Sequence, residues 1–128
     1  MSTDLQTFAE EDFCYLTTTG RVSGRPHTIE IWYVLNGHTL YMLSGGLDKS
    51  DWVKNLLRLP GVSVKIKDRL FTGQARFVKD VQEDALARQL IARKYPSTDE
   101  EDLTTWYRDA LPVAVDITKE TEYNGSLS

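Results

Sequence analysis

Two arginines and a serine lie close together in the segment GRVSGRP, residues 20–26. Glycine and proline favour a tight turn there, but a turn does not require guanidinium groups. Arg21, Ser23 and Arg25, with backbone amides beside two glycines, can hold an oxyanion through several hydrogen bonds. The alternative is a hairpin turn whose arginines are only solvated, and charge alone does not separate the two interpretations.

A second segment whose residues could bind a ligand is SGGLDKSDW, residues 44–52. Gly45 and Gly46 carry no side chains, so a flat ligand can lie against bare backbone. Lys49 and the amides of a helix that begins near Ser50 offer a second place for an anion. A lysine just before a helix start is slightly unfavourable with the helix dipole, which hints at a compensating anion. The alternative is a flexible loop in which Ser50 caps the helix.

Most familiar catalytic motifs are missing from the sequence. It contains no CxxC, HExxH, Walker or Gly-x-Ser-x-Gly pattern. His27 and His38 lack metal-ligand spacing and are expected at strand surfaces or strand ends. Cys14 lies in an apolar run, where a small buried thiol is expected rather than a nucleophile. We therefore predict no metal site and no essential catalytic side chain.

The charge is unevenly spread along the 128 residues, whose net charge is −4. Residues 21–79 hold ten Lys and Arg against four acids, whereas residues 80–128 hold five against eleven. General nucleic-acid binding usually requires a basic domain, so this balance argues against it. A basic middle in an acidic chain instead suits a local site for a small anion, although strands often carry Lys and Arg on their solvated face.

Length and hydropathy predict one domain without a membrane span. No apolar run approaches the roughly 20 residues that a spanning helix needs. The segment MSTDLQTFAEEDF is acidic and has no apolar core, so it does not read as a secretory signal. A cytoplasmic location is the expectation that follows.

Alternation and turn residues predict six strands and three helices. The strand 27–35 is apolar on both faces, so both are expected to be covered, and Asn36-Gly37 is the strongest hairpin signal. Gly73 is expected at a bulge or close approach. The predicted strands are 13–19, 27–35, 38–44, 62–67, 70–78 and 111–118, and the predicted helices are 51–59, 81–95 and 97–110.

This order predicts a mainly β, α+β domain in which a small, mostly antiparallel barrel is flanked by helices. The expected divisions are an N-terminal segment 1–12, a barrel domain 13–118 and a loose tail 119–128. Both glycine-containing segments follow strands of the sheet. A ligand with a flat ring and a charged tail could therefore bridge them.

The motifs resemble a known family at this point. LTTTGRVSGRPHTIEIWY, then YMLSGGLDKSDWVKNLLRLPGVSVKI, then LPVAV, are similar to the deazaflavin-dependent nitroreductase and quinone reductase family. That family belongs to the split β-barrel flavin-binding superfamily, which includes pyridoxamine 5′-phosphate oxidase. The resemblance spans residues 13–117 and implies a six-stranded split barrel.

The resemblance also implies a cofactor, which is an 8-hydroxy-5-deazaflavin or, in the wider superfamily, FMN. The arginine turn would hold its phosphate or acidic tail, the Gly-Gly segment and helix start would lie against its ring, and aromatic residues would cover the substrate. The implied cofactor-binding residues are Arg21, Ser23, Gly24, Arg25, Pro26, His27, Ser44, Gly45, Gly46, Lys49, Ser50, Trp52 and Asn55. The implied substrate residues are Tyr95, Trp106 and Tyr107.

The function expected on this basis is hydride transfer between the cofactor and a small quinone, nitroaromatic or enone. Two alternatives stay open: an FMN-binding oxidoreductase of the pyridoxamine 5′-phosphate oxidase type, and a non-catalytic carrier of a lipid-like or tetrapyrrole ligand. Split barrels of this kind usually pair, so a homodimer is expected with the ring near the interface, where Trp32 and Tyr33 could contribute.

Overall fold

The computed structural model of the protein describes residues 5–121. A short 3₁₀ helix, Leu5–Phe8, precedes seven strands and three α-helices. The strands are β1 (Cys14–Thr19), β2 (Pro26–Ile31), β3 (Val34–Asn36), β4 (Thr39–Ser44), β5 (Gly61–Ile66), β6 (Arg69–Phe77) and β7 (Leu111–Thr121). The helices are α1 (Asp51–Arg58), α2 (Val81–Lys94) and α3 (Thr104–Asp109). The element order therefore follows the sequence-based prediction, with one strand divided in two.

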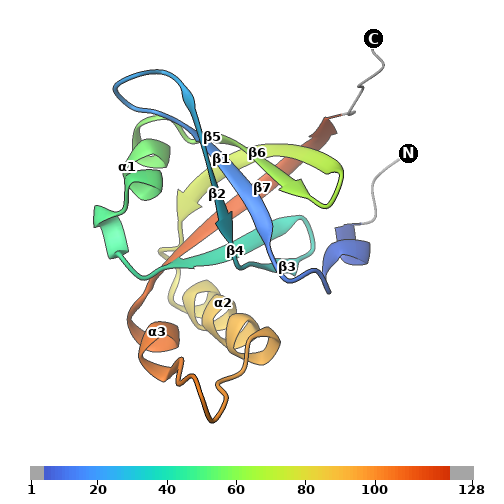
Figure 1. Cartoon of the computed structure of the whole chain (residues 1–128), viewed down its shortest axis with the longest axis vertical. Coiled ribbons are helices and arrows are strands. Elements are labelled where there is room, and N and C mark those ends of the chain that lie inside the picture. Colours follow the sequence, from blue (N-terminus) through green and yellow to red (C-terminus); the bar gives the residue numbers. More distant parts are fainter. Residues whose placement is uncertain (1–4, 122–128) are drawn as a thin grey trace.

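All seven strands form one antiparallel sheet in the order β2-β1-β5-β6-β7-β4-β3. The two edge strands, β2 and β3, are consecutive in the chain and are joined only by Trp32 and Tyr33. The three residue steps from Ile31 to Val34 span at most about 11 Å. The sheet must therefore curl until its edges approach each other, which produces the half-barrel in Figure 1. This confirms the predicted mainly β, mostly antiparallel barrel with flanking helices.

The prediction of a continuous strand over 27–35 is wrong at its centre. The chain leaves the sheet at Trp32 and Tyr33, which accounts for seven strands where six were expected. Tyr33 is fully buried in the barrel, and the next residue, Val34, packs into a different apolar cluster. Alternation alone describes both halves equally well, so the break was not visible in the sequence pattern.

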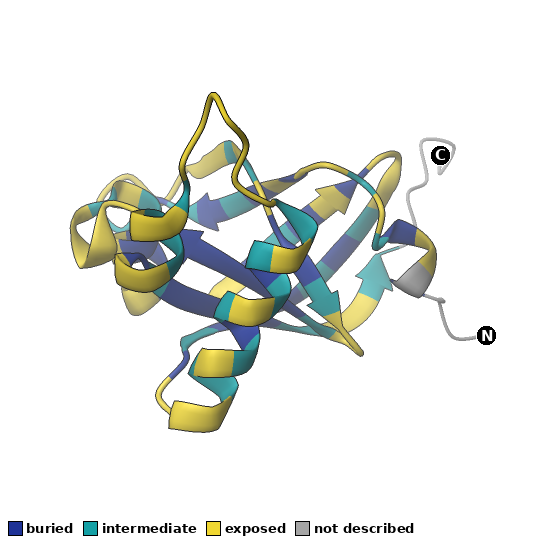
Figure 2. Cartoon of the chain, turned by 90° about the horizontal axis from the view of Figure 1, so that it is seen from below, coloured by how far each residue is buried: buried dark blue, intermediate teal, exposed yellow. Residues whose placement is uncertain are grey.

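Apolar residues form two clusters, one on each face of the sheet. The cluster inside the barrel includes Leu40 and Met42, whereas Tyr41 and Leu43 of the same strand face α2. β7 behaves alike, since Val113 and Val115 point inward and Ala114 points toward α2. Figure 2 shows buried positions along these strands and exposed ones on the outer sides of the helices. Covering on both faces explains why these strands read as continuous apolar runs.

The predicted helix over 97–110 is wrong in its first half. α3 begins only at Thr104, and segment 97–103 is a loop in which Thr98 Oγ1 accepts hydrogen bonds from the amides of Glu100 and Glu101. Ser97 Oγ accepts another from the amide of Leu103. Side chains that bond nearby backbone offer the chain an alternative to the helix, and here that alternative prevails.

Both ends of the described part of the chain lie against the barrel. Leu5 and Phe8 of the N-terminal segment are buried in the barrel cluster. β7 continues to Thr121, three residues beyond the predicted end of the domain at 118. The rest of the tail that was predicted to be loose, 122–128, lies outside the described residues. Within residues 5–121 no helix is long and apolar enough to cross a membrane.

An ion-pair network fastens the start of α2 to the sheet. Arg76 donates hydrogen bonds to both carboxylate oxygens of Glu83, at 2.9 and 2.8 Å, and to Asp116 at 2.6 Å. Tyr41 Oη donates another to Glu83 at 2.6 Å. The hydrogen bonds from the Arg76 guanidinium have the largest effect, and with the bond from Tyr41 they lower the pKa of Glu83 from 4.5 to about 2. Glu83 therefore joins β4, β6 and α2 in its ionised form.

We expect Glu83→Gln to reduce the acid sensitivity of folding. A carboxylate whose pKa is depressed in the fold adds stability above its ordinary pKa and loses it as the pH falls toward the folded value. Between pH 4.5 and about 2 the wild type should lose about 1–2 kcal/mol more than the variant, after allowance for solvent screening. Urea unfolding across this range measures the difference. Glu100→Gln, in the exposed 97–103 loop, should retain the wild-type slope, and equal slopes for all three proteins would contradict the assignment.

Candidate functional site

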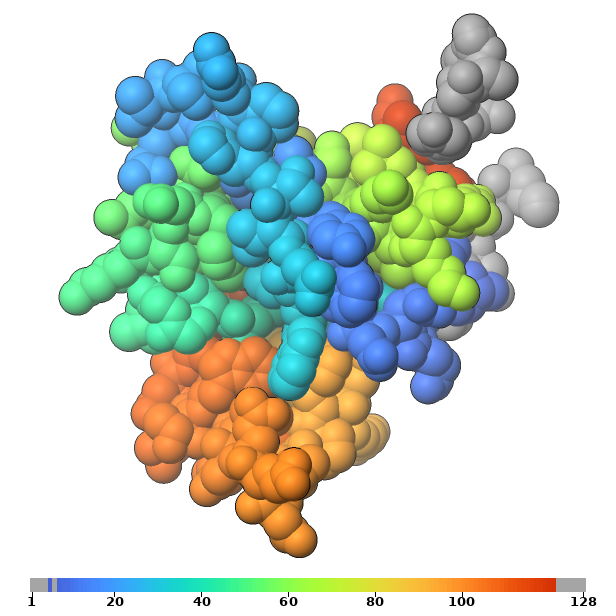
Figure 3. All heavy atoms as spheres, in the orientation of Figure 1, coloured from blue at the N-terminus to red at the C-terminus, as the bar shows by residue number. Residues whose placement is uncertain are grey.

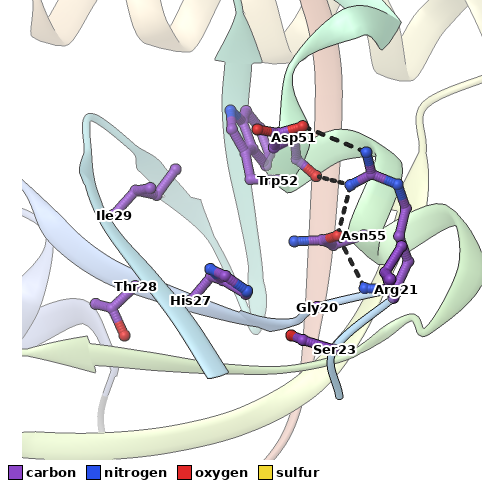
Figure 4. Close-up of a pocket in the computed structure, with 10 residues that line it drawn as sticks. Gly20, Arg21, Ser23, His27, Thr28, Ile29, Asp51, Trp52 and Asn55 are labelled. Carbon is purple, nitrogen blue, oxygen red and sulfur yellow. Dashed lines mark hydrogen bonds and ion pairs between the residues drawn. The ribbon is translucent and has the colours of Figure 1, made fainter. Parts of the chain in front are cut away.

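A cavity of about 530 Å³ lies between the loop that joins β1 to β2 and the first turns of α1. Figure 3 shows this loop next to α1 on one face of the molecule, and Figure 4 shows the side chains that line the cavity. They are Gly20, Arg21, Val22, Ser23, His27, Thr28, Ile29, Asp51, Trp52 and Asn55. The cavity thus joins the arginine turn to the start of α1, whereas Gly45 and Gly46 do not line it.

Arg21 is held in a defined position at this cavity. Its backbone amide donates to Asn55 Oδ1 at 3.1 Å, and its Nη1 donates to the same oxygen at 2.8 Å. Nη2 lies 3.3 Å from Asp51 Oδ1, and the Arg21 side chain is 29% exposed. These contacts, drawn in Figure 4, keep a positive group fixed at the cavity rim. The simple alternative of solvated arginines is therefore wrong for Arg21.

Asn55 links Arg21 to the barrel through hydrogen bonds to both. Its side chain is 3 % exposed, and its Nδ2 donates to Thr18 Oγ1 of β1 at 3.2 Å. Buried amides usually have all their hydrogen bonds satisfied, and no buried polar side-chain atom of residues 5–121 lacks a partner. Asn55 thereby connects a core strand to the guanidinium.

The β1–β2 loop is closed by its own backbone bonds. The Gly20 amide donates to the Arg25 carbonyl at 2.7 Å, and the Gly24 amide donates to the Gly20 carbonyl at 2.9 Å. Gly24 has φ +73°, a conformation that side chains other than glycine rarely adopt. A Cβ on Gly20 would lie 2.7 Å from both His27 Nε2 and Ser23 Oγ, so these two side chains close over bare backbone. The predicted turn is confirmed, and it brings His27 to the cavity.

The structure brings only part of the implied cofactor set to this cavity. Of the thirteen residues, five line it: Arg21, Ser23, His27, Trp52 and Asn55. Arg25 is exposed outside it, and its amide donates to Ser23 Oγ at 3.1 Å. The others that do not line it are Gly24, Pro26, Ser44, Gly45, Gly46, Lys49 and Ser50.

The Gly-Gly segment leads from β4 into α1 through a short 3₁₀ helix, Leu47–Lys49. Ser50 occupies the N-cap position of α1, as predicted, but its side chain does not bond the helix amides. Its hydroxyl instead lies 3.2 Å from that of Ser44, which also donates to the Leu47 carbonyl at 2.9 Å. The first amides of α1 therefore have no side-chain cap.

Four aromatic side chains gather beside Gly45. Trp32 stacks on Tyr95 with ring centroids 4.4 Å apart, and Trp106 meets Trp32 edge-on at 5.7 Å. Tyr107 packs against Trp106, and its hydroxyl donates to the Tyr95 carbonyl. A Cβ on Gly45 would touch Trp106 at 3.7 Å. The three residues implied for the substrate therefore lie together, with Trp32 as an addition, next to the Gly-Gly segment.

Cys14 is a small buried thiol, as the sequence predicted. Cys14 is fully buried, and desolvation raises the pKa of its thiol to about 12, so it stays protonated. Within residues 5–121 no cluster of three or more His, Cys, Asp or Glu could hold a metal ion. A buried, protonated thiol is not placed to act as a nucleophile.

Sequence reasoning did not select five of the residues that line the cavity: Gly20, Val22, Thr28, Ile29 and Asp51. Gly20 and Val22 lie inside the arginine turn and Thr28 and Ile29 lie just after it in β2, so their place in or near the turn was the available signal. Asp51 was interpreted only as an acid favourable in the first helical turn. Nothing local indicates that it faces a residue thirty positions earlier.

Comparison with known proteins provides the remaining evidence. The sequence model of the family described as F420H(2)-dependent quinone reductase matches residues 2–118. That match covers nearly the whole chain.

Solved structures show the same fold at low sequence identity. An F420-H2 dependent reductase is 20% identical with a TM-score of 0.67, covering 82% of this chain and 94% of that one. A haem storage protein from Vibrio cholerae is 17% identical with a TM-score of 0.68, covering 94% and 96%. A structure described as a domain-swapped dimer is 24% identical with a TM-score of 0.66, covering 82% and 80%. At these identities the likeness establishes the fold alone.

Proposed function

Since the chain belongs to the F420H2-dependent quinone reductase family, it is an oxidoreductase that uses an F420-type deazaflavin, and we propose that its substrate is a small quinone. The family match carries the proposed substrate, and the observation that carries the proposed cofactor site is Arg21, held at the rim of a cavity that reaches the start of α1. When bound, the deazaflavin supplies hydride transfer, and the protein supplies binding, orientation and protection from water.

The arginine turn would bind the anionic tail of the cofactor. Arg21 presents a guanidinium that Asn55 already orients, so little rotamer freedom is lost when an anion binds. The start of α1, where Ser50 makes no side-chain cap bond, contributes Asp51 and Trp52 to the same cavity, and a helix N-terminus favours negative charge. Both features fit an acidic tail or a phosphate.

The Gly-Gly segment and the aromatic cluster would hold the ring and the substrate. Gly45 leaves bare backbone next to Trp106, and Trp32 as a residue is 36% exposed. Flat aromatic faces suit a planar ring and a planar quinone, because offset stacking contributes beyond simple burial. This arrangement would also keep water away from the reacting atoms.

The hydroxyls near this cluster are engaged in structure. Tyr95 Oη donates to the carbonyls of Asp12 and Tyr33, at 2.6 and 3.1 Å, and Tyr107 Oη donates to the Tyr95 carbonyl. Ser44 donates to the Leu47 carbonyl. These groups would position the rings rather than deliver a proton, which supports the prediction that no side chain is an essential acid.

We also propose that the protein is a homodimer. One structural neighbour is described as a domain-swapped dimer, and Trp32 leaves an aromatic edge exposed near the proposed ring site. Light scattering coupled to size exclusion should give twice the 14.6 kDa chain mass. A mass of one chain at micromolar concentration would contradict this.

The function is tested by titration with F420 and with FMN, followed by ligand fluorescence, and then by oxidation of F420H2 with a soluble naphthoquinone. Micromolar binding of F420 and turnover of the quinone are expected. Binding of FMN alone would overturn the proposed cofactor site. Turnover of a nitroaromatic or an enone without the quinone would change the substrate class. Binding of haemin without any turnover would favour the carrier alternative.

We expect Gly45→Ala to weaken F420 binding while the fold stays intact. The added methyl would make only ordinary contact with Trp106, so the free energy of unfolding should change by less than about 0.5 kcal/mol. The methyl would, however, hold a flat ring off the backbone, and F420 affinity should fall about tenfold. Gly61→Ala, at an exposed glycine of β5 whose Cβ would lie 3.6 Å from Gln74, is the control for both measurements. Unchanged affinity would remove Gly45 from the ring site.

A further inference from the structure

The guanidinium of Arg21 faces two partners of different character. Asn55 accepts from it at 2.8 Å and is buried, whereas the carboxylate of Asp51 lies 3.3 Å away and its side chain is 87% exposed. Nη1 also approaches the Asp51 carbonyl at 3.5 Å. Figure 4 shows Asp51 and Asn55 on neighbouring parts of the Arg21 guanidinium, at the rim of the cavity.

Asn55 alone is enough to orient Arg21. The backbone amide and Nη1 of Arg21 share Asn55 Oδ1, and Asn55 is itself fastened to Thr18 in the barrel. Asp51 adds one longer contact from an exposed side chain, which is the kind of ion pair that contributes little to stability. Its carboxylate nevertheless neutralises the charge that an incoming anion would use.

We propose that Asp51 is an internal competitor for Arg21, which an anionic ligand must displace, and that it thereby sets how much negative charge a ligand must carry. The inference rests on the proposed role of Arg21 in binding the cofactor tail. Because the Asp51 side chain is exposed, it can rotate into water while Asn55 keeps the guanidinium in place. The occupied and free states of Arg21 then differ by one side-chain rotation.

This competition favours ligands with several negative charges. A single carboxylate or phosphodiester replaces Asp51 by an equivalent partner and gains little. A ligand with further anionic groups would also lie near the start of α1, which contributes Asp51 and Trp52 to the same cavity and favours negative charge. Asp51 itself lies in the first turn of α1, where the helix dipole favours its ionised form.

The test measures ligand affinity directly rather than turnover. The purified protein is titrated with F420 and with 8-hydroxy-5-deazariboflavin, which has the ring without the anionic tail. Asp51→Asn should bind F420 about five-fold more tightly, which corresponds to the loss of one exposed ion pair, and should bind the tailless compound unchanged. Asp48→Asn is the matched control, because Asp48 is an exposed acid nearby that does not line the cavity. It should change either affinity by less than about two-fold.

Two further variants separate the possible outcomes. When Asp51→Asn is made in an Arg21→Ala background, the gain in F420 affinity should disappear. Asp51→Ser repeats the test in case asparagine disturbs the start of α1. Equal or weaker F420 binding by both Asp51 variants would overturn the inference, as would an equal gain in Asp48→Asn. If the wild type bound both compounds equally and Arg21→Ala changed neither affinity, the proposed anion site would fail as well. The two failures are therefore distinguishable.

Discussion

Replacing Arg21 and Arg25 together by alanine is expected to weaken F420 binding by about 2–4 kcal/mol, or about 30-fold to 1,000-fold. Arg21 should account for most of the loss, because it is fixed at the cavity, whereas Arg25 is exposed outside it. Arg25→Ala alone is expected to lower the F420 affinity by less than about tenfold. Fluorescence titration of each variant measures these values.

The fold should survive this double substitution. Asn55 Oδ1 would keep the hydrogen bond from the amide of residue 21, so no buried acceptor loses its last partner. The midpoint temperature of thermal unfolding should therefore change little. Lys54→Ala with Arg58→Ala, on the exposed side of α1, removes the same charge and should leave the affinity within about 0.5 kcal/mol. A loss below about 0.5 kcal/mol for the arginine pair itself would remove these residues from the site.

Gly73→Ala is expected to destabilise the fold by about 3 kcal/mol or more. β6 and β7 change register here: Thr72 pairs with Lys119 and Gly73 with Ile117, so that Thr118 is the extra residue. A Cβ on Gly73 would overlap the Asp116 carbonyl and approach Val115 Cγ1 at 3.0 Å. Backbone of a paired central strand cannot move aside cheaply, and the bulge predicted from this glycine is confirmed.

Urea unfolding measures this loss. Gly61→Ala is again the control, because the new methyl would make only ordinary contact and should cost less than about 0.5 kcal/mol. A loss below about 1 kcal/mol for Gly73→Ala would mean that β7 yields at the bulge. The close approach of Gly73 to the Asp116 carbonyl would then not require a glycine at this position.

Much of the fold follows from local sequence. The Asn36-Gly37 turn formed as predicted, with Gly37 at φ +64°, and the alternation of β5 buried Val62, Val64 and Ile66. These features depend on residues a few positions apart, where backbone preferences and the period of two act directly. The predicted helix over 97–110 failed at its start for a local reason as well, since hydroxyls of Ser97 and Thr98 bonded the backbone.

The residue types of the site were also visible in the sequence. Glycines, arginines and a helix start indicated an anion and a flat ring, because each supplies a distinct kind of contact. The family resemblance agrees with the match over residues 2–118. Which of the implied residues share one cavity was not visible.

Tertiary structure alone decided how Arg21 is held. Asn55 and Asp51 lie 34 and 30 positions away from it in the chain, and no local pattern relates residues at such separations. The break at Trp32 and the stacking of Trp32 on Tyr95 likewise depend on how the sheet curls and where the helices pack. Local propensities set the elements, whereas the balance of charge at Arg21 depends on side chains that meet only after the barrel closes.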